Sequence, residues 1–352
     1  MGARQPGVGA WVTAPVAAHP TDLTRALALA FGVTRAAAAP VVRQLEREAF
    51  VLRSGGSTRP VFAAGPSRYI EERFDLPGVD ESAVWERSFS PWLSLPPNVL
   101  NLLHYGLTEM VNNANDHSEG RHLIVRCAVA AGVVYLTVID DGIGIFERMG
   151  RAFGLTDRRL ALLELSKGRV TTDPTRHTGE GIFFTSRAFR VFSLQANGLA
   201  YERRNREPDE GDTPALIELP IDRLGGPPGP PQAGTLAAMA LRTTSSLVLR
   251  DLFTAYTTGA PEDLTFDRTV IPVRLARLGT ENLLSRSQAK RLLAGVDRFK
   301  RVELDFEGVP EIGQAFADEV FRVFASAHPE LQLRDMHAGI GLLPMIRRAT
   351  WA

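Results

Sequence analysis

The chain has 352 residues, a length that allows two or three domains. Hydrophobic residues make up 44% of it, which is enough for sizeable cores and excludes the disordered class. The 40 basic residues balance the 40 acidic ones, so the overall charge does not indicate a nucleic-acid partner. Residues 1–70 differ, because they hold eight arginines against three acidic residues. This local excess favours a polyanionic partner for the N-terminal part.

Residues 21–65 predict two helices followed by a hairpin. The first helix starts at Asp22, has apolar residues at helical spacing and is broken by Gly32. Thr34 fits the N-cap of a second helix, while Pro40 leaves a later start, near that proline, open. Two short apolar runs then flank the turn cluster RSGGST, which is typical of a hairpin.

This order resembles a winged-helix domain, which implies DNA binding through residues 21–65. The arginines expected to contact phosphates are Arg35, Arg43, Arg53 and Arg59. The second helix begins TRAAAAP, however, and alanine offers no hydrogen bonds to base edges. A small helical docking domain is the alternative interpretation.

The middle of the chain predicts a proline-rich connector over residues 66–97 and then an alternation of helices and strands. The expected helices are 98–115, 157–165 and 181–190, and the expected strands are 123–129, 133–139, 191–202, 215–219 and one that starts at Gly234-Thr235. Cys127, the single cysteine, lies in an alternating apolar run, so we expect a small buried residue. The N-terminus has no signal-peptide pattern, and no apolar run approaches the roughly 20 residues that span a bilayer. We therefore expect a reducing, cytoplasmic location with no membrane partner.

Three short motifs follow in a fixed order, and the first is EMVNNANDH, which starts at Glu109. Asn113 comes one helical turn after Glu109, so both side chains fall on one face of a helix. A carboxylate beside a phosphate chain can orient a water for attack on the terminal phosphate. The amide oxygen of Asn113 suits Mg²⁺, a hard cation that prefers oxygen ligands, with Asn112 and Asn115 as the nearest alternatives. Asp116 would line the phosphate end.

The second motif, DDGIGI, follows an apolar strand. The carboxylate of Asp140 can accept a hydrogen bond from the exocyclic amine of adenine. Gly142 and Gly144 let the backbone approach the base without a side-chain clash. Thr235, at the start of a later strand, would complete this adenine pocket by a hydrogen bond or a bridging water.

The third motif, TGEGIFF, opens a helix with Gly179 and Gly181. Free amides and the positive end of the helix dipole at this position suit a phosphate. Residues 147–178, between the second and third motifs, have the size and polarity of a lid over a triphosphate, with Lys167 among its basic residues.

Together the three motifs resemble the ATP pocket of the gyrase, Hsp90, histidine-kinase and MutL (GHKL) superfamily. The resemblance implies a Bergerat ATP-binding fold, which is an α/β sandwich with a mixed sheet, and it implies ATP and Mg²⁺ as cofactors. It makes Glu109 the catalytic base and Asn113 the metal ligand. One departure is GEGIFF, where many relatives have a third glycine near Phe183, and this bears on hydrolysis more than on binding.

The last hundred residues predict a separate α/β unit, with strands at 301–306 and 331–334 and a helix at 314–327. This segment resembles the STAS-type fold of anti-sigma-factor antagonists, which implies a protein partner. Those antagonists carry a phosphorylatable serine after the first of these strands. Ala315 stands at that position, so we do not expect a phosphorylation switch there.

The sequence thus predicts an α/β multidomain protein with a winged helix in 1–70, an ATP-binding domain in 71–250 and a STAS-like domain in 251–352. We interpret it as a cytoplasmic regulator in which ATP and Mg²⁺ order the lid and change how the flanking domains are presented, with or without slow ATP hydrolysis. Two alternatives stay open. One is a serine or histidine-type protein kinase resembling the anti-sigma-factor kinases, and the other is an ATPase clamp that forms a homodimer on binding nucleotide.

Overall fold

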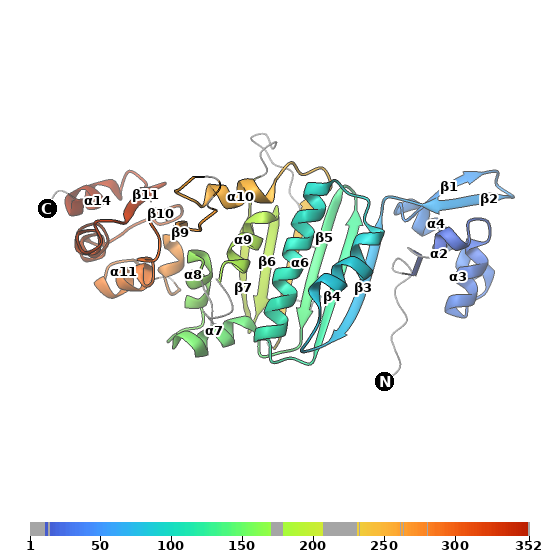
Figure 1. The fold of residues 1–352 in the computed structure, drawn as a ribbon, viewed down its shortest axis with the longest axis horizontal. Helices are drawn as coiled ribbons and strands as arrows, with labels where there is room; N and C mark the ends of the chain where they lie inside the picture. The colour runs from blue at the N-terminus through green and yellow to red at the C-terminus, as the bar shows by residue number, and fades with distance from the viewer. Residues whose placement is uncertain are drawn as a thin grey trace. The chain divides into compact units, whose positions relative to one another are not determined.

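The structure, a computed structural model, shows a mixed α/β protein whose described residues form a six-stranded sheet, a three-stranded sheet and a two-stranded hairpin (Figure 1). It describes residues 11–12, 15–169, 179–206, 231, 233–260, 262, 264–279 and 281–350. The chain divides into two compact units. The first unit contains residues 1–144 and 189–247, and the second contains 145–188 and 248–352. This division differs from the boundaries expected at 70/71 and 250/251, because residues 145–188 group with the C-terminal part.

The N-terminal part of the first unit is a small helical domain with a hairpin. Its elements are α2 (Pro15–Ala18), α3 (Leu23–Phe31), α4 (Arg35–Arg47), β1 (Val51–Gly55) and β2 (Pro60–Ala64). Gly32 ends α3 in the left-handed conformation, with φ of 65°. The hydroxyl of Thr34 accepts a hydrogen bond from the Ala37 amide at 3.2 Å and so caps α4. The later start near Pro40 was wrong, since α4 accommodates the exposed proline in its interior.

These helices and the hairpin share one apolar core. Because each element turns one side to this core, its apolar residues recur at a regular spacing in the sequence. The buried members of the core include Leu27, Val42, Leu45 and Phe62. In the described part of the chain, no single helix is long and apolar enough to cross a membrane; α3 and α4 meet that measure only as a pair bent by 115°.

The larger sheet lies in the first unit and has the strand order β3-β4-β5-β8-β6-β7. The strands are β3 (Arg68–Asp75), β4 (His122–Ala130), β5 (Val133–Asp140), β6 (Val191–Ala196), β7 (Leu199–Arg204) and β8 (Thr235–Arg242). Helix α6 (Pro97–His117) lies across one face of this sheet (Figure 1). Gly106 permits the close approach, because a Cβ there would come within 2.6 Å of Phe189 and 3.3 Å of Met239. Cys127 is buried on this sheet, as expected.

Every strand pair in this sheet is antiparallel, whereas the resemblance implied a mixed sheet. The difference follows from where β8 is inserted. β5 and β6 run in the same direction, and β8 enters between them in the opposite direction. With hairpins on both sides, the directions alternate across the whole sheet.

Two segments of the first unit differ from their expected structure. The single strand expected over 191–202 is a hairpin of β6 and β7, because Asn197 and Gly198 both adopt positive φ, 51° and 73°. The connector expected over 66–97 contains β3 as well as three short helical elements. These are α5 (Glu81–Ala83), η1 (Val84–Phe89) and η2 (Ser90–Trp92). The strand expected over 215–219 lies outside the described residues.

The second unit contains a parallel three-stranded sheet with the order β11-β10-β9. Its strands are β9 (Arg268–Pro272), β10 (Arg301–Asp305) and β11 (Gln332–Met336). Its helices are α7 (Ile145–Phe153), α8 (Leu160–Lys167), α9 (Gly181–Ala188), α10 (Leu249–Ala255), η3 (Val273–Ala276), α11 (Arg286–Leu293), α12 (Gln314–Ala317), η4 (Asp318–Phe324), α13 (Ala325–Ala327) and α14 (Leu343–Thr350). The strands expected near 301 and 331 and the helix expected near 314 are present.

Candidate functional site

Asp140 and Thr235, which are 95 residues apart in sequence, lie opposite each other at the ends of β5 and β8. Oδ1 of Asp140 accepts hydrogen bonds from the Thr235 amide at 3.2 Å and from the Gly142 amide at 2.9 Å. Burial raises the pKa of the Asp140 carboxyl above its usual value, and the bonds from Gly142 and Thr235 act against this rise. The carboxylate is therefore held in one orientation at the end of two central strands of the sheet.

The turn after Asp140 packs directly on the residue that follows α6. A Cβ on Gly142 would lie 2.0 Å from the carbonyl oxygen of Ser118, so only glycine fits this approach. The Ile143 amide donates to the same Ser118 oxygen at 2.9 Å, and the Gly234 amide donates to the Gly142 oxygen at 2.7 Å. The helix end, the turn and the start of β8 are thus joined by backbone contacts.

Gly144 has a separate structural reason to be glycine. Its φ is +84°, and a Cβ there would meet the side-chain amide of Asn197 at 2.4 Å. Asn197 in turn donates to the carbonyl oxygen of Ile143 at 2.9 Å. Sequence reasoning missed Asn197 as a support of this turn, although the Asn-Gly pair was a readable signal.

Helix α6 carries the predicted catalytic and metal-binding residues near its C-terminal end. Glu109 and Asn113 lie on successive turns and are half-buried, and Asp116 is exposed. Asn113 and Asp116 both fall within five residues of Ser118, which contacts the Gly142 turn. The structure therefore brings these two residues near the end of the sheet that holds Asp140, whereas Glu109 lies a turn farther from that end.

Asn115, an alternative metal ligand by sequence, has another role. Its Oδ1 accepts from the amides of Gly78 and Val79, both at 3.1 Å, and its Nδ2 donates to the Val79 oxygen at 2.7 Å. These bonds fix the loop between β3 and α5 against α6. The side-chain amide of Asn115 is thus occupied, which makes it a poorer candidate for a cation ligand than Asn113.

Asp141 is a structural residue that sequence reasoning did not single out. Its Oδ1 accepts from the amides of Arg121 and His122 at 2.7 and 2.9 Å, and its Oδ2 lies 2.7 Å from Nδ1 of His122. Partial burial acts to raise its pKa, but these hydrogen bonds prevail and lower it to about 2. Asp141 therefore stays ionised and fixes the start of β4 beside the turn.

The other predicted site residues, Lys167, Gly179 and Gly181, belong to the second unit. Lys167 is 0% exposed. Its ammonium donates to the Glu164 carboxylate at 2.7 Å and to the carbonyl oxygens of Arg291 and Ala294, both at 3.1 Å. These three bonds use all three ammonium protons. Residues 170–178 of the expected lid lie outside the described residues.

Helix α9, which Gly181 begins, is held within the second unit by aromatic contacts. Phe183 lies 4.5 Å from Phe266 and 5.0 Å from Tyr256, measured between ring centroids. The guanidinium carbon of Arg187 lies 3.3 Å from the centroid of Phe183, and its Nε donates to the Tyr256 hydroxyl at 3.0 Å. Phe183, where the GHKL resemblance implied a glycine, is thus a core residue.

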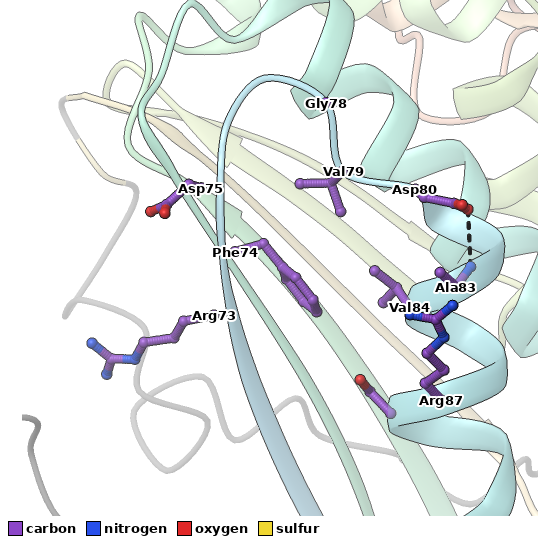
Figure 2. A pocket seen from close by; sticks show the side chains of 10 residues that line it. Arg73, Phe74, Asp75, Gly78, Val79, Asp80, Ala83, Val84 and Arg87 are labelled. Carbon is purple, nitrogen blue, oxygen red and sulfur yellow. Dashed lines mark hydrogen bonds between the residues drawn. The ribbon is translucent and has the colours of Figure 1, made fainter.

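An open hollow of about 450 Å³ lies in the first unit, between the end of β3 and the segment that contains α5 and η1 (Figure 2). Figure 2 shows Phe74 directed toward Val79 and Val84, with Arg87 beside them. Asp80 accepts from the Ala83 amide at 2.9 Å and so caps α5. The hollow is lined mainly by small apolar and charged groups, and none of the three motifs contributes to it.

One comparison with known proteins identifies part of the second unit. A family model described as a STAS-like domain of unknown function (DUF4325) matches residues 288–337. This stretch contains β10, β11 and the helix between them, so the C-terminal segment is STAS-like. No curated protein matches the chain. Ala315 lies in the first turn of α12, after β10.

Proposed function

We propose that this protein is an ATP-binding regulator, whose first unit recognises adenine through Asp140 and Thr235. The observation that carries the proposal is the fixed carboxylate of Asp140, which the Gly142 and Thr235 amides orient at the end of strand β5. A carboxylate so held can accept the exocyclic amine of adenine, and Gly142 brings the backbone close without a side chain in the way.

Mg²⁺ would be held by Asn113, since the competing amide of Asn115 is occupied by the loop after β3. Held there, the ion would supply positive charge that offsets the negative charge of the phosphates. Glu109 is the group that could orient a hydrolytic water. Gly179 and Gly181 remain predicted phosphate contacts. We leave Lys167 out of the proposed site, because its ammonium is buried and fully bonded within the second unit.

The direct test is binding of ATP to the full chain by calorimetry, with Mg²⁺ present. Asp140→Asn replaces the acceptor oxygen by a donor that opposes the adenine amine, so we expect at least a tenfold loss of affinity for ATP. Glu109→Ala should retain ATP affinity and lose any hydrolysis. Asp141→Asn is the neighbouring control, since Asp141 holds β4 and not the base. Unchanged ATP affinity in Asp140→Asn would remove the adenine assignment.

The segments that flank the proposed ATP site favour a regulatory role over a purely enzymatic one. The chain carries a basic helical domain at its N-terminus and a STAS-like segment at its C-terminus. We propose DNA as the partner of the first and a protein as the partner of the second. Incubation with γ-labelled ATP separates this proposal from the kinase and the hydrolytic clamp, by whether label appears on protein, as free phosphate or on neither.

A further inference from the structure

Strand β3 is the outer strand of the six-stranded sheet. Its eight residues pair with β4 without a bulge, from Arg68 opposite Val129 to Asp75 opposite His122. Within the described part of the chain, no strand pairs with its other side. Such an edge presents a row of backbone donors and acceptors that can pair with another strand, and this one is longer than a typical strand of about five or six residues.

The sequence of β3, RYIEERFD, is complementary to itself in an antiparallel arrangement. When the pairing is centred on Glu72, Glu71 of each copy faces Arg73 of the other, and Ile70 of each faces Phe74 of the other. Opposite-charge and apolar cross-strand pairs of this kind each stabilise a sheet relative to alanine pairs. We propose that β3 is the docking edge for a second copy of this chain, joined by antiparallel β3–β3 pairing about a two-fold axis at Glu72.

The side chains of β3 are arranged as this pairing requires. Figure 2 shows Arg73 and Asp75 on one side of the strand and Phe74 on the other, so the charged and apolar pairs form on opposite faces. The Arg73 side chain is 62% exposed, and its guanidinium reaches Glu71 of its own copy at 3.1 Å. Glu71 also accepts from Arg126 at 2.7 Å, so its carboxylate is already fixed before a second guanidinium arrives.

The register shifted by one residue is excluded for a two-fold pair, because it would set Glu71 opposite Glu72, whose side chains lie on opposite faces of the strand. The next allowed register, centred on Arg73, places Glu71 opposite Asp75 twice, and like charges directly opposite each other are destabilising. In the register centred on Glu72, the one like-charge pair is Glu72 with its own copy at the two-fold axis. An isologous dimer with a single unfavourable central pair is therefore expected.

The pairing does not depend on the proposed nucleotide function, so its test is made without ATP. A cysteine at the two-fold axis measures the register directly. Residues directly opposite in an antiparallel pair have Cα atoms about 4.5–5.5 Å apart, within the range that a disulfide bridges. Glu72→Cys in the full chain should form a disulfide-linked dimer under mild oxidation. The native Cys127 does not interfere, because it is buried and burial raises the pKa of its thiol to about 12.

Asp75→Cys is the matched control, because it is also exposed and on the same strand. In the proposed register, the thiol introduced at this position and its copy in the second chain lie six residues apart along the strand, or about 20 Å. The control should therefore form little disulfide-linked dimer under the same oxidation. Equal crosslinking rates for the two variants, or none for Glu72→Cys, would overturn the proposal.

Sedimentation of the unmodified chain gives an independent readout. A single strand pair buries little surface, so we expect a monomer–dimer equilibrium in the micromolar range or weaker. Arg73→Glu should weaken the dimer at least tenfold, because it sets two carboxylates opposite each other at both charged pairs. Glu72→Thr should strengthen it by removing the central repulsion. A chain that stays monomeric at several hundred micromolar, or variants that shift the equilibrium in the other direction, would contradict β3–β3 pairing.

Discussion

At Asp140, burial and hydrogen bonding together set the pH range in which the carboxyl is ionised. Burial raises the pKa of its carboxyl, although bonds from Gly142 and Thr235 oppose the rise. Only the ionised form can accept the adenine amine without offering a proton. We therefore predict that ATP affinity falls on acidification, at a higher pH than an ordinary aspartate would give.

Calorimetric titration of ATP at a series of pH values measures this dependence. The sign follows from the direction of the shift: affinity is full above the raised pKa and is lost as the pH falls through it. Asp140→Asn, which has no titrating group, should bind weakly at every pH. An affinity of the unmodified chain that persists down to the pH at which an ordinary aspartate titrates would contradict this role.

Lys167 was predicted as a phosphate contact, but in the structure its bonds stabilise the second unit. The lid interpretation implies that this lysine contacts a phosphate. Its ammonium is instead buried against Glu164 and two carbonyl oxygens. Removing one member of a buried pair costs about 3–5 kcal/mol, because the remaining groups lose their partner. We predict that Lys167→Ala lowers the free energy of unfolding in urea by about this amount.

Lys167→Met separates packing from charge, since it keeps most of the volume and removes the donors. It should recover part of the loss seen in Lys167→Ala. ATP affinity, measured under conditions where both variants are folded, should stay close to that of the unmodified chain. Lost affinity with unchanged unfolding free energy would return Lys167 to the phosphate site.

At the scale of elements, α8 and α9 are built into the second unit. Thr269 on β9 donates to the Lys167 oxygen at 2.7 Å, and Arg169 and Arg298 each donate to the other's carbonyl oxygen. Phe266 packs on Phe183 of α9. These contacts make residues 145–188 part of the core that surrounds the parallel sheet.

A fragment of residues 248–352 should therefore be unstable alone. It lacks α8 and α9, so Phe266 and Thr269 lose the groups that bury them and bond to them. We predict no cooperative thermal transition for this fragment by circular dichroism, and recovery of one when a peptide of residues 145–188 is added. A cooperative melt of the isolated fragment would show that the C-terminal boundary expected near residue 250 is sufficient for folding.

The element scale also shows what could be read from the sequence. The α3–α4 pair, β4–β5 and the β10–β11 region were predictable because each has a strong local period or cap. The β6–β7 hairpin was missed because the apolar run continues on both sides of Asn197-Gly198. β3 was missed because its charged residues do not alternate regularly with apolar ones, and because prolines lie before and after it.

At the scale of the whole molecule, the net charge of zero conceals a basic N-terminal domain. Arg53 and Arg59 are exposed on and beside its hairpin. We predict that the full chain binds duplex DNA at low salt and that binding weakens as salt rises. Replacing both arginines by glutamine should make the slope of log affinity against log salt less steep, by the amount that about two phosphate contacts contribute.

Mobility shift across a salt series measures this slope. Arg121→Gln is the control, because Arg121 is exposed but lies outside the N-terminal domain. DNA binding that is indifferent to Arg53 and Arg59, or no binding at low salt, would favour the docking-domain interpretation for residues 21–65.

The sequence by itself determined the elements with local periodicity, the turn after Asp140 and the STAS-like C-terminal segment. These depend on interactions between residues near each other in the chain, so caps, turns and alternation reveal them. Tertiary structure alone decided that Asn197 supports the turn after Asp140, that Asn115 holds a loop and that Lys167 is buried. Each of these depends on strands and helices from distant parts of the chain, whose pairing no local pattern contains.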